Sequence, residues 1–256
     1  MFDLSGKTAL ITGGTRGLGK AIAAVMAQNG ANVALNYRRD ENSARAALEE
    51  IRRLAPRAIL LKADLEDDAQ VRTMVREAAA QLGRLDILVA NAAATAFKPL
   101  LETRPHNLQR TFNLTIGGFV AAVQEASKAM SDGGRIIAIS GMDSVRHLPG
   151  HGALGAAKAA MESMVRDFAF ELGPRGITVN AINFAYLETD SSQIYFGDEL
   201  EVSTARVRAR SALKRLAAPA EVAAIVCMVA MPEASYLTGQ TIMVDGGLLL
   251  ESPAAP

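Results

Sequence analysis

The stretch TALITGGTRGLG, residues 8–19, decides the fold of this chain. Its first half is a short β-rich run, and its second half places Gly13, Gly17 and Gly19 where a helix is expected to begin. Glycines at such a turn permit a tight bend and let backbone N–H groups approach a pyrophosphate at the helix N-terminus. The spacing Gly-x-x-x-Gly-x-Gly is a variant of the more usual Gly-x-Gly-x-x-Gly. It predicts a dinucleotide-binding turn in an α/β domain.

Six further β-rich runs follow this turn and alternate with segments of helical spacing. Such alternation predicts parallel strands joined by helical crossovers, and continuous apolar strands fit a doubly wound sheet covered on both faces. No linker or repeat divides residues 1–256, so a single domain is expected. The long, weakly patterned segment 188–216 is expected to form a lid over the substrate. The predicted strands are 8–12, 32–37, 58–63, 86–91, 135–140, 177–182 and 240–245.

The composition excludes several classes of partner. Half of the 256 residues are apolar, and 27 basic residues balance 27 acidic ones, so no charged surface for nucleic acid or an anionic membrane is indicated. Cys227 has no second cysteine to pair with and lies in the apolar run VAAIVCMVAM, which is too short to span a bilayer. The first residues do not resemble a signal peptide. We expect a cytoplasmic protein that binds neither nucleic acid nor membrane.

Further motifs follow in a characteristic order: ADL with Asp64, NAAA at 91–94, Asn113, Lys158, and MVDGG at 243–247. Together with the glycine turn they resemble the short-chain dehydrogenase/reductase family over nearly the whole length. The resemblance implies a single Rossmann-type domain with a seven-stranded parallel sheet, usually assembled as a homotetramer. Two predicted helices that are apolar on more than one face agree with a subunit interface.

The same resemblance implies how a nicotinamide cofactor is held. Asp64 would bind the adenine amino group, Asn91 would lie beside the adenosine ribose, and Thr189 would lie near the nicotinamide amide. The NAAA motif departs from the family's Asn-Asn-Ala-Gly, which crowds that turn without excluding the cofactor. No metal site is expected. The expected cofactor contacts are Gly13, Thr15, Arg16, Gly17, Leu18, Gly19, Arg38, Asp64, Leu65, Asn91, Lys158 and Thr189.

The choice between NAD and NADP is a question of charge. An acidic residue at the end of the second strand would bind the ribose hydroxyls of NAD and repel a 2′-phosphate. That position holds Tyr37, followed by Arg38 and Arg39, and Arg16 in the first turn can approach the same place. Guanidinium groups form strong charge-assisted hydrogen bonds with phosphate. Although solvated surface arginines are the alternative, we expect NADP(H).

The catalytic residues depart from the family's Asn, Ser, Tyr and Lys. Asn113 and Lys158 match, but alignment on GRIIAIS and on Lys158 places Leu154 at the tyrosine. The same alignment places Gly141 at the serine, one residue after Ser140. Leucine cannot donate a proton and glycine has no side chain to bind a carbonyl. Another group must therefore supply the proton chemistry, if the protein performs it.

A second pattern offers a candidate. The stretch AISGMDSVRHLPGHGALGAAKAAMESM, residues 138–164, is similar to the NADPH-dependent enoyl-acyl-carrier-protein reductase III branch, in which a tyrosine lies seven residues before the lysine. His151 occupies that position here. Imidazole titrates near pH ~6.5 and is a common general acid. The alternative is a histidine at a helix start, bonded to backbone or water; His147 and His106 are weaker candidates.

Tyr186 and Ser140 are further candidates for binding or protonating the substrate. Tyr186 follows Phe184 and Ala185, which replace the family's Pro-Gly turn, and its phenol could reach a bound carbonyl or simply form pocket wall. Enoyl reduction depends less on a proton-donating side chain than carbonyl reduction does, because the α-carbon can take its proton from water. The sequence thus favours an NADPH-dependent reductase of an enoyl or keto thioester, small or bound to a carrier protein.

Two other classes of function remain open. One is a non-redox biosynthetic enzyme on the same fold, such as a cyclase, dehydratase or isomerase. The other is a catalytically silent partner subunit that keeps a nucleotide for folding. Both are compatible with a missing tyrosine, because the sequence reveals which residue is absent and not what has replaced it.

Overall fold

All seven predicted strands lie in one sheet, in the order β3-β2-β1-β4-β5-β6-β7, and every pairing is parallel. The computed structural model describes residues 3–187, 197 and 200–250. The strand positions agree with the predicted runs, except that β5 begins five residues early because Met130 pairs with Leu85. The strands are β1 Thr8–Ile11, β2 Asn32–Tyr37, β3 Ile59–Lys62, β4 Leu85–Ala90, β5 Met130–Gly141, β6 Thr178–Phe184 and β7 Thr241–Val244.

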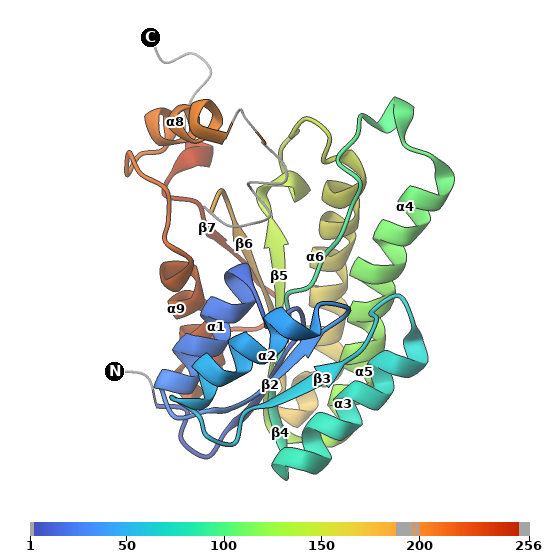
Figure 1. Cartoon of the computed structure of the whole chain (residues 1–256), viewed down its shortest axis with the longest axis vertical. Helices are drawn as coiled ribbons and strands as arrows, with labels where there is room; N and C mark the ends of the chain where they lie inside the picture. Colours follow the sequence, from blue (N-terminus) through green and yellow to red (C-terminus); the bar gives the residue numbers. More distant parts are fainter. Residues whose placement is uncertain (1–2, 188–196, 198–199, 251–256) are drawn as a thin grey trace.

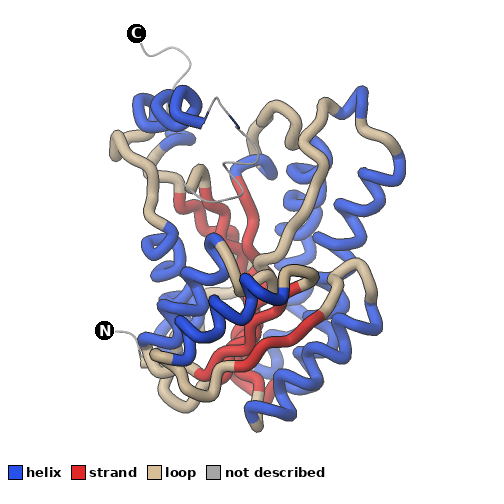
Figure 2. Tube along the Cα trace, viewed as in Figure 1, coloured by secondary structure: helices blue, strands red, loops and turns tan. Residues whose placement is uncertain are grey.

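Helices cover both faces of the sheet (Figures 1 and 2), as the continuous apolar strands predict. Helices α1, α2 and α9 pack on one face, and α3, α5 and α6 pack on the other. A π-helical turn, Asn113–Gly117, joins α4 to α5. The α-helices are α1 Gly17–Gln28, α2 Glu41–Arg52, α3 Asp68–Leu82, α4 Pro105–Phe112, α5 Gly118–Ala129, α6 Gly152–Leu172, α8 Leu200–Arg210 and α9 Pro219–Ala230.

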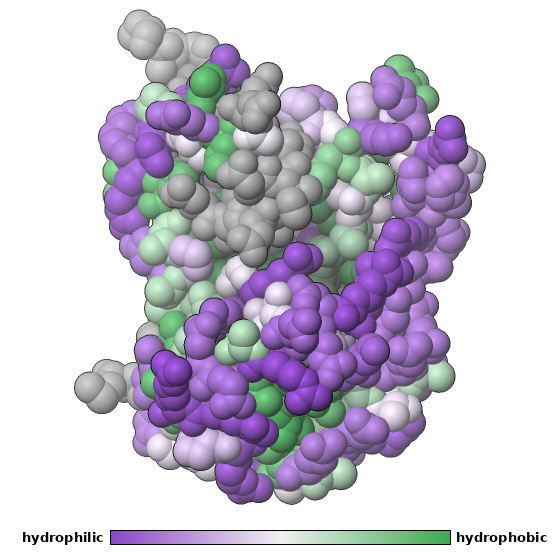
Figure 3. Space-filling model, viewed as in Figure 1, coloured by the Kyte–Doolittle hydropathy of each residue, from purple (hydrophilic) through white to green (hydrophobic). Residues whose placement is uncertain are grey.

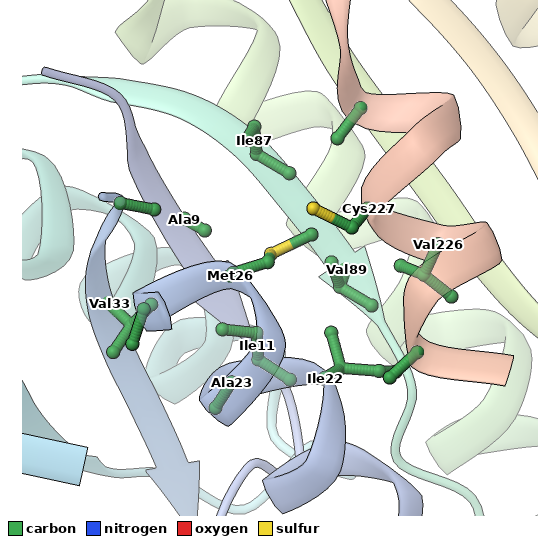
Figure 4. Close-up of a cluster of buried hydrophobic side chains, with 14 of the residues drawn as sticks. Ala9, Ile11, Ile22, Ala23, Met26, Val33, Ile87, Val89, Val226 and Cys227 are labelled. Carbon is green, nitrogen blue, oxygen red and sulfur yellow. The ribbon is translucent and has the colours of Figure 1, made fainter. Parts of the chain in front are cut away.

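The core on the α1 side is built from close contacts between helices and central strands (Figure 4). Met26 of α1 lies beside Cys227 of α9, close to Ile11 and Val89, with Ile22 one turn earlier on α1, and all five side chains are fully buried. Burial raises the pKa of the Cys227 thiol to about 11, so the thiol stays protonated at neutral pH. Cys227 is thus a free, buried cysteine, in agreement with its place in an apolar run.

The strand order reverses between β1 and β4, and this is where the sheet positions a site. Strands β2 and β3 continue from β1 in one direction, and β5, β6 and β7 continue from β4 in the other. The loops that follow β1 and β4 therefore diverge and leave a crevice at the carboxyl edge of the sheet, which is the usual ligand position in open α/β sheets. The glycine turn and Asn91 both lie there.

The surface differs between the two ends of the view in Figure 3. Hydrophilic residues cover much of the part around α2 and α3, whereas hydrophobic atoms stand out at the tip above α4, where Leu100 and Leu101 are exposed. In the described segments, no helix is both long and apolar enough to cross a bilayer. The described part of segment 188–216 includes α8, which lies beyond the carboxyl ends of β6 and β7 (Figure 1). A lid role for this segment stays a prediction.

Candidate active site

The glycine turn after β1 has the backbone geometry that its sequence predicts. Gly13 and Gly17 adopt φ values of +61° and +51°, in the left-handed region that residues with a side chain rarely enter. Gly19 has a different reason to be glycine: a Cβ there would lie 2.2 Å from the Gly13 carbonyl oxygen and 2.7 Å from the Asn91 side chain. The third glycine thus lets α1 pack directly against its own turn.

The N-terminus of α1 suits a pyrophosphate. Arg16 precedes the helix with an extended backbone; in this described turn no side chain caps the helix and no acidic residue lies in its first turn. The backbone N–H groups there are thus available to an anion, which the helix dipole also favours. Thr12 and Asn91 fix the turn to β4: the Asn91 side chain donates to the Thr12 carbonyl at 2.9 Å, and the Thr12 hydroxyl accepts from the Asn91 N–H at 2.9 Å.

Acidic partners hold the arginine expected to bind the adenosine 2′-phosphate. Arg38 donates to Glu66 at 3.1 Å and lies 3.8 Å from an Asp64 oxygen. Arg110 donates to the same Glu66 oxygen at 2.9 Å. Arg16 is exposed in the neighbouring turn. Since Arg38 already has a carboxylate partner, a 2′-phosphate must compete with Glu66 for it, a feature that no sequence motif indicated.

The remaining predicted cofactor residues fall into three groups. Leu18 and Leu65 are buried, in the apolar cores on opposite faces of the sheet. Thr15 and Asp64 are partly exposed. Thr189 lies outside the described residues, so its predicted contact with the nicotinamide amide stays a prediction.

Lys158 lies deep between α6 and β5. Its side chain is 5% exposed, and its ammonium group donates to the Ile139 carbonyl oxygen. Burial lowers the pKa of Lys158 from its ordinary 10.5 to about 8, while the nearby carboxylates of Asp143 and Glu162 oppose this shift. The lysine therefore carries its charge in the protein interior at neutral pH, within electrostatic reach of two acids.

A buried carboxylate organises the polar side chains beneath Lys158. Glu162 lies one helical turn after Lys158 and accepts hydrogen bonds from three side chains, Ser140, Ser144 at 2.8 Å and Asn183 at 2.9 Å. The Ser140 hydroxyl is thus directed to Glu162 inside the protein, with 1% of the residue exposed. The structure brings Ser140 and Lys158 together around this network, which the sequence did not reveal.

His151 precedes the first turn of α6 and lies against an acid. Its Nδ1 atom is 3.1 Å from an Asp143 carboxylate oxygen, and the Phe97 ring lies 4.9 Å from the imidazole, centroid to centroid. Asp143 comes from the single 3₁₀ turn after β5, Met142–Ser144. Both residues line a hollow of about 240 Å³ between the loop 143–148 and the first two turns of α6. Asp143 was not among the predicted site residues.

Two other predicted site residues, Asn113 and Tyr186, lie on elements other than α6 and β5. Asn113 begins the π-helical turn after α4, where its side chain is exposed and accepts from Gln109 at 2.6 Å. Tyr186 follows the end of β6 and is half-buried. Leu154, which the sequence alignment is expected to place at the family's tyrosine, is half-buried on α6 between His151 and Lys158.

Comparison with known proteins agrees with this geometry. A family model described as Enoyl-(Acyl carrier protein) reductase matches residues 13–249. A 1-cyclohexenylcarbonyl-CoA reductase of Streptomyces collinus is 37% identical over 96% of this chain and 88% of its own length. A hydroxynaphthalene reductase-like protein of Metarhizium brunneum is 34% identical over 96% of both chains.

Solved structures share the fold as well. A short-chain dehydrogenase from Burkholderia cenocepacia in complex with NADP superposes with a TM-score of 0.89 at 34% identity, covering 96% of this chain and 99% of that one. The family model, the curated relatives and the solved structure thus each match nearly the whole of this chain. On these findings, the chain belongs to the short-chain dehydrogenase/reductase family of NAD(P)-dependent oxidoreductases.

Proposed function

We propose that this protein is an NADPH-dependent reductase of enoyl thioesters, carried on coenzyme A or on an acyl carrier protein, in which His151 donates the proton. The observation that carries the proposal is the His151–Asp143 pair at the start of the helix that also bears Lys158. His151 and Lys158 are seven residues apart, about two helical turns, and so project from the same side of α6. Reduction of a ketone on a related intermediate is the nearest variant.

The residues of the crevice fit NADPH. The uncapped N-terminus of α1 suits the pyrophosphate, and Arg16 and Arg38 suit the 2′-phosphate, with Tyr37 in place of the acid that would repel it. The Lys158 ammonium is suited to the ribose hydroxyls beside the nicotinamide. NADP in the similar Burkholderia structure supports this assignment. When bound, the cofactor supplies the hydride, and with it both electrons of the reduction.

The surroundings of His151 suit an apolar acyl group. Phe97 lies against the imidazole, and Leu100 packs over Gly152, where a Cβ would come within 2.5 Å of the leucine side chain. Phe97, Leu100 and Leu101 are all exposed, so this apolar edge is open to a ligand. The Streptomyces relative, named for an unsaturated acyl-CoA, supports a thioester substrate.

The chain's own residues have two tasks in this reaction. Once hydride has been added to the β-carbon, negative charge develops on the thioester oxygen, and a hydrogen bond or proton from His151 stabilises it. Lys158 contributes a buried positive charge on the same side of α6. Tyr186 is the alternative donor, since Ser140 already donates to Glu162. Water can then complete protonation at the α-carbon.

The test is NADPH oxidation measured on a series of enoyl-CoA thioesters and on matched ketones. His151→Phe is expected to lower the rate by about 10²–10⁴-fold while NADPH still binds, because a lost general acid costs about that much. His106→Phe, which removes an exposed imidazole at the start of α4, is the matched control and should change little.

Two results would contradict the proposal. A strong effect of Tyr186→Phe with a silent His151→Phe would assign the proton to the phenol. If no thioester or ketone oxidises NADPH, the reductase assignment fails, and turnover without nicotinamide consumption would then indicate a non-redox enzyme.

A further inference from the structure

Asp143 combines deep burial with two charged neighbours. Its side chain is 6% exposed, it lies 3.1 Å from His151 Nδ1, and it is close enough to Lys158 to oppose the lowering of the lysine pKa. An ionised carboxylate in such a place is costly unless it is paired. Among the described contacts of its side chain, the imidazole is the direct partner. The carboxylate is therefore a candidate for a role in the site rather than in packing alone.

The space that Asp143 occupies is the space left by the missing serine. Gly141 stands at the serine position of the family pattern, and a Cβ built on it would lie 2.7 Å from an Asp143 carboxylate oxygen. Such a distance is too short for carbon and oxygen that are not bonded. A serine at position 141 and this position of the Asp143 carboxylate thus exclude one another. A side chain at position 141 would therefore require the Asp143 carboxylate to move away from where it now lies.

The backbone of Asp143 is held in place from the other side. A Cβ at Gly155, on the first turns of α6, would lie 2.3 Å from the Asp143 carbonyl oxygen. Only glycine lets the 3₁₀ turn approach the helix this closely. Two glycines, one on β5 and one on α6, thus make room for the turn that carries the carboxylate to His151.

We propose that Asp143 is the positioning residue of His151: it accepts the Nδ1 hydrogen, and so fixes Nε2 as the nitrogen that serves the substrate. The proposal rests on the proposed function for its catalytic consequence. The hydrogen bond made by one ring nitrogen of a histidine decides which of the two nitrogens carries the hydrogen. An ionised carboxylate has no proton to donate, so its partner Nδ1 must be the nitrogen that carries the hydrogen. The Phe97 ring against the imidazole restrains its plane.

The resulting proton transfer balances. The imidazolium breaks its Nε2–H bond, the electron pair stays on the ring, and an O–H bond forms on the enolate oxygen of the substrate. The imidazole is left neutral, with its Nδ1–H still hydrogen-bonded to Asp143, and water that enters after the product leaves returns a proton to Nε2. The two electrons of the reduction come from the hydride of NADPH, so Asp143 neither gains nor loses a proton.

The direct test reads the tautomer without substrate. In protein labelled with ¹⁵N-histidine, nitrogen NMR resolves the three histidines at a pH chosen so that all three are neutral, and His151→Gln assigns the signal. We expect hydrogen on Nδ1 in the wild type and its loss from Nδ1 in Asp143→Asn. Glu162→Gln is the matched control, since it removes a carboxylate near Lys158 whose hydrogen bonds come from Ser140, Ser144 and Asn183. Hydrogen on Nε2 in the wild type would overturn the proposal.

Kinetics give the second measurement. Asp143→Asn is expected to lower kcat by about 10²–10⁴-fold with KM little changed, as for loss of the acid that orients a catalytic histidine. Gly141→Ala should have a similar effect by displacing Asp143, and the double variant should be no worse than either single one. Unchanged kcat in Asp143→Asn refutes the role. If the wild type reduces nothing, the proposed function fails, while the tautomer still decides whether Asp143 positions His151.

Discussion

Replacing Lys158 by methionine should make the nucleotide-free protein more stable at neutral pH while it abolishes nucleotide binding. The pKa of the buried ammonium falls from 10.5 to about 8, which corresponds to about 3 kcal/mol at ~1.4 kcal/mol per pH unit. Methionine fills a similar volume without charge, but it leaves the Ile139 carbonyl oxygen without its donor, at a cost of about 1–2 kcal/mol. The net expected gain is about 1–2 kcal/mol.

The assay is thermal unfolding without nucleotide at several pH values. A gain of about 1–2 kcal/mol corresponds to a rise in Tm of roughly 2–8 °C for a chain of this size. Above pH 8 the unfolded chain holds its Lys158 proton while the folded wild type releases it, so wild-type stability rises with pH up to about 10.5. The advantage of Lys158→Met is therefore full below pH 8 and shrinks as the pH rises from 8 to about 10.5.

Lys62, an exposed lysine of β3, supplies the matched control: Lys62→Met should show no such pH-dependent gain. A Lys158→Met protein that is less stable than the wild type at pH 7 would refute the reasoning. So would a stability difference that does not change between pH 7 and pH 10, because burial of the charge would then not be the cause. Retained NADPH affinity in Lys158→Met would contradict the role of the lysine at the cofactor.

In a fluorescence titration, Arg38→Ala should remove most of the preference for NADPH over NADH. Glu66→Gln should strengthen NADPH binding, because Arg38 then loses its carboxylate partner. Equal affinities of the wild type for NADPH and NADH would contradict NADP selectivity. Gly19→Ala should destroy binding of either nucleotide, because its Cβ would meet the Gly13 carbonyl; unchanged titration curves would refute this. Light scattering should report a homotetramer. Phe170→Asp should dissociate it, because this large apolar side chain of α6 is 88% exposed on the single chain and is expected to be covered by another subunit. A monomeric wild type would exclude this assembly.

Much of the fold was predictable because its signals are local. Each strand is a short apolar run, and each crossover has helical spacing. The glycines of the first turn are required by the backbone conformation of that turn itself, which involves only a few neighbouring residues. The family motifs then located Lys158 on α6 and His151 at its start, because their spacing along the chain follows the helical repeat. That Leu154 replaces the family's tyrosine stays a prediction of the same motifs.

The partners of those residues were decided by the tertiary structure. Asp143 reaches His151 only because a 3₁₀ turn after β5 folds back onto α6, and Glu162 meets Ser140 and Asn183 because β5 and β6 lie beside that helix. Neither meeting follows from a periodic pattern, since it depends on how a turn and two strands pack. The local sequence determines the backbone conformation of each element. The distance from Lys158 to the carboxylate of Asp143 depends instead on how separate elements of the chain pack together.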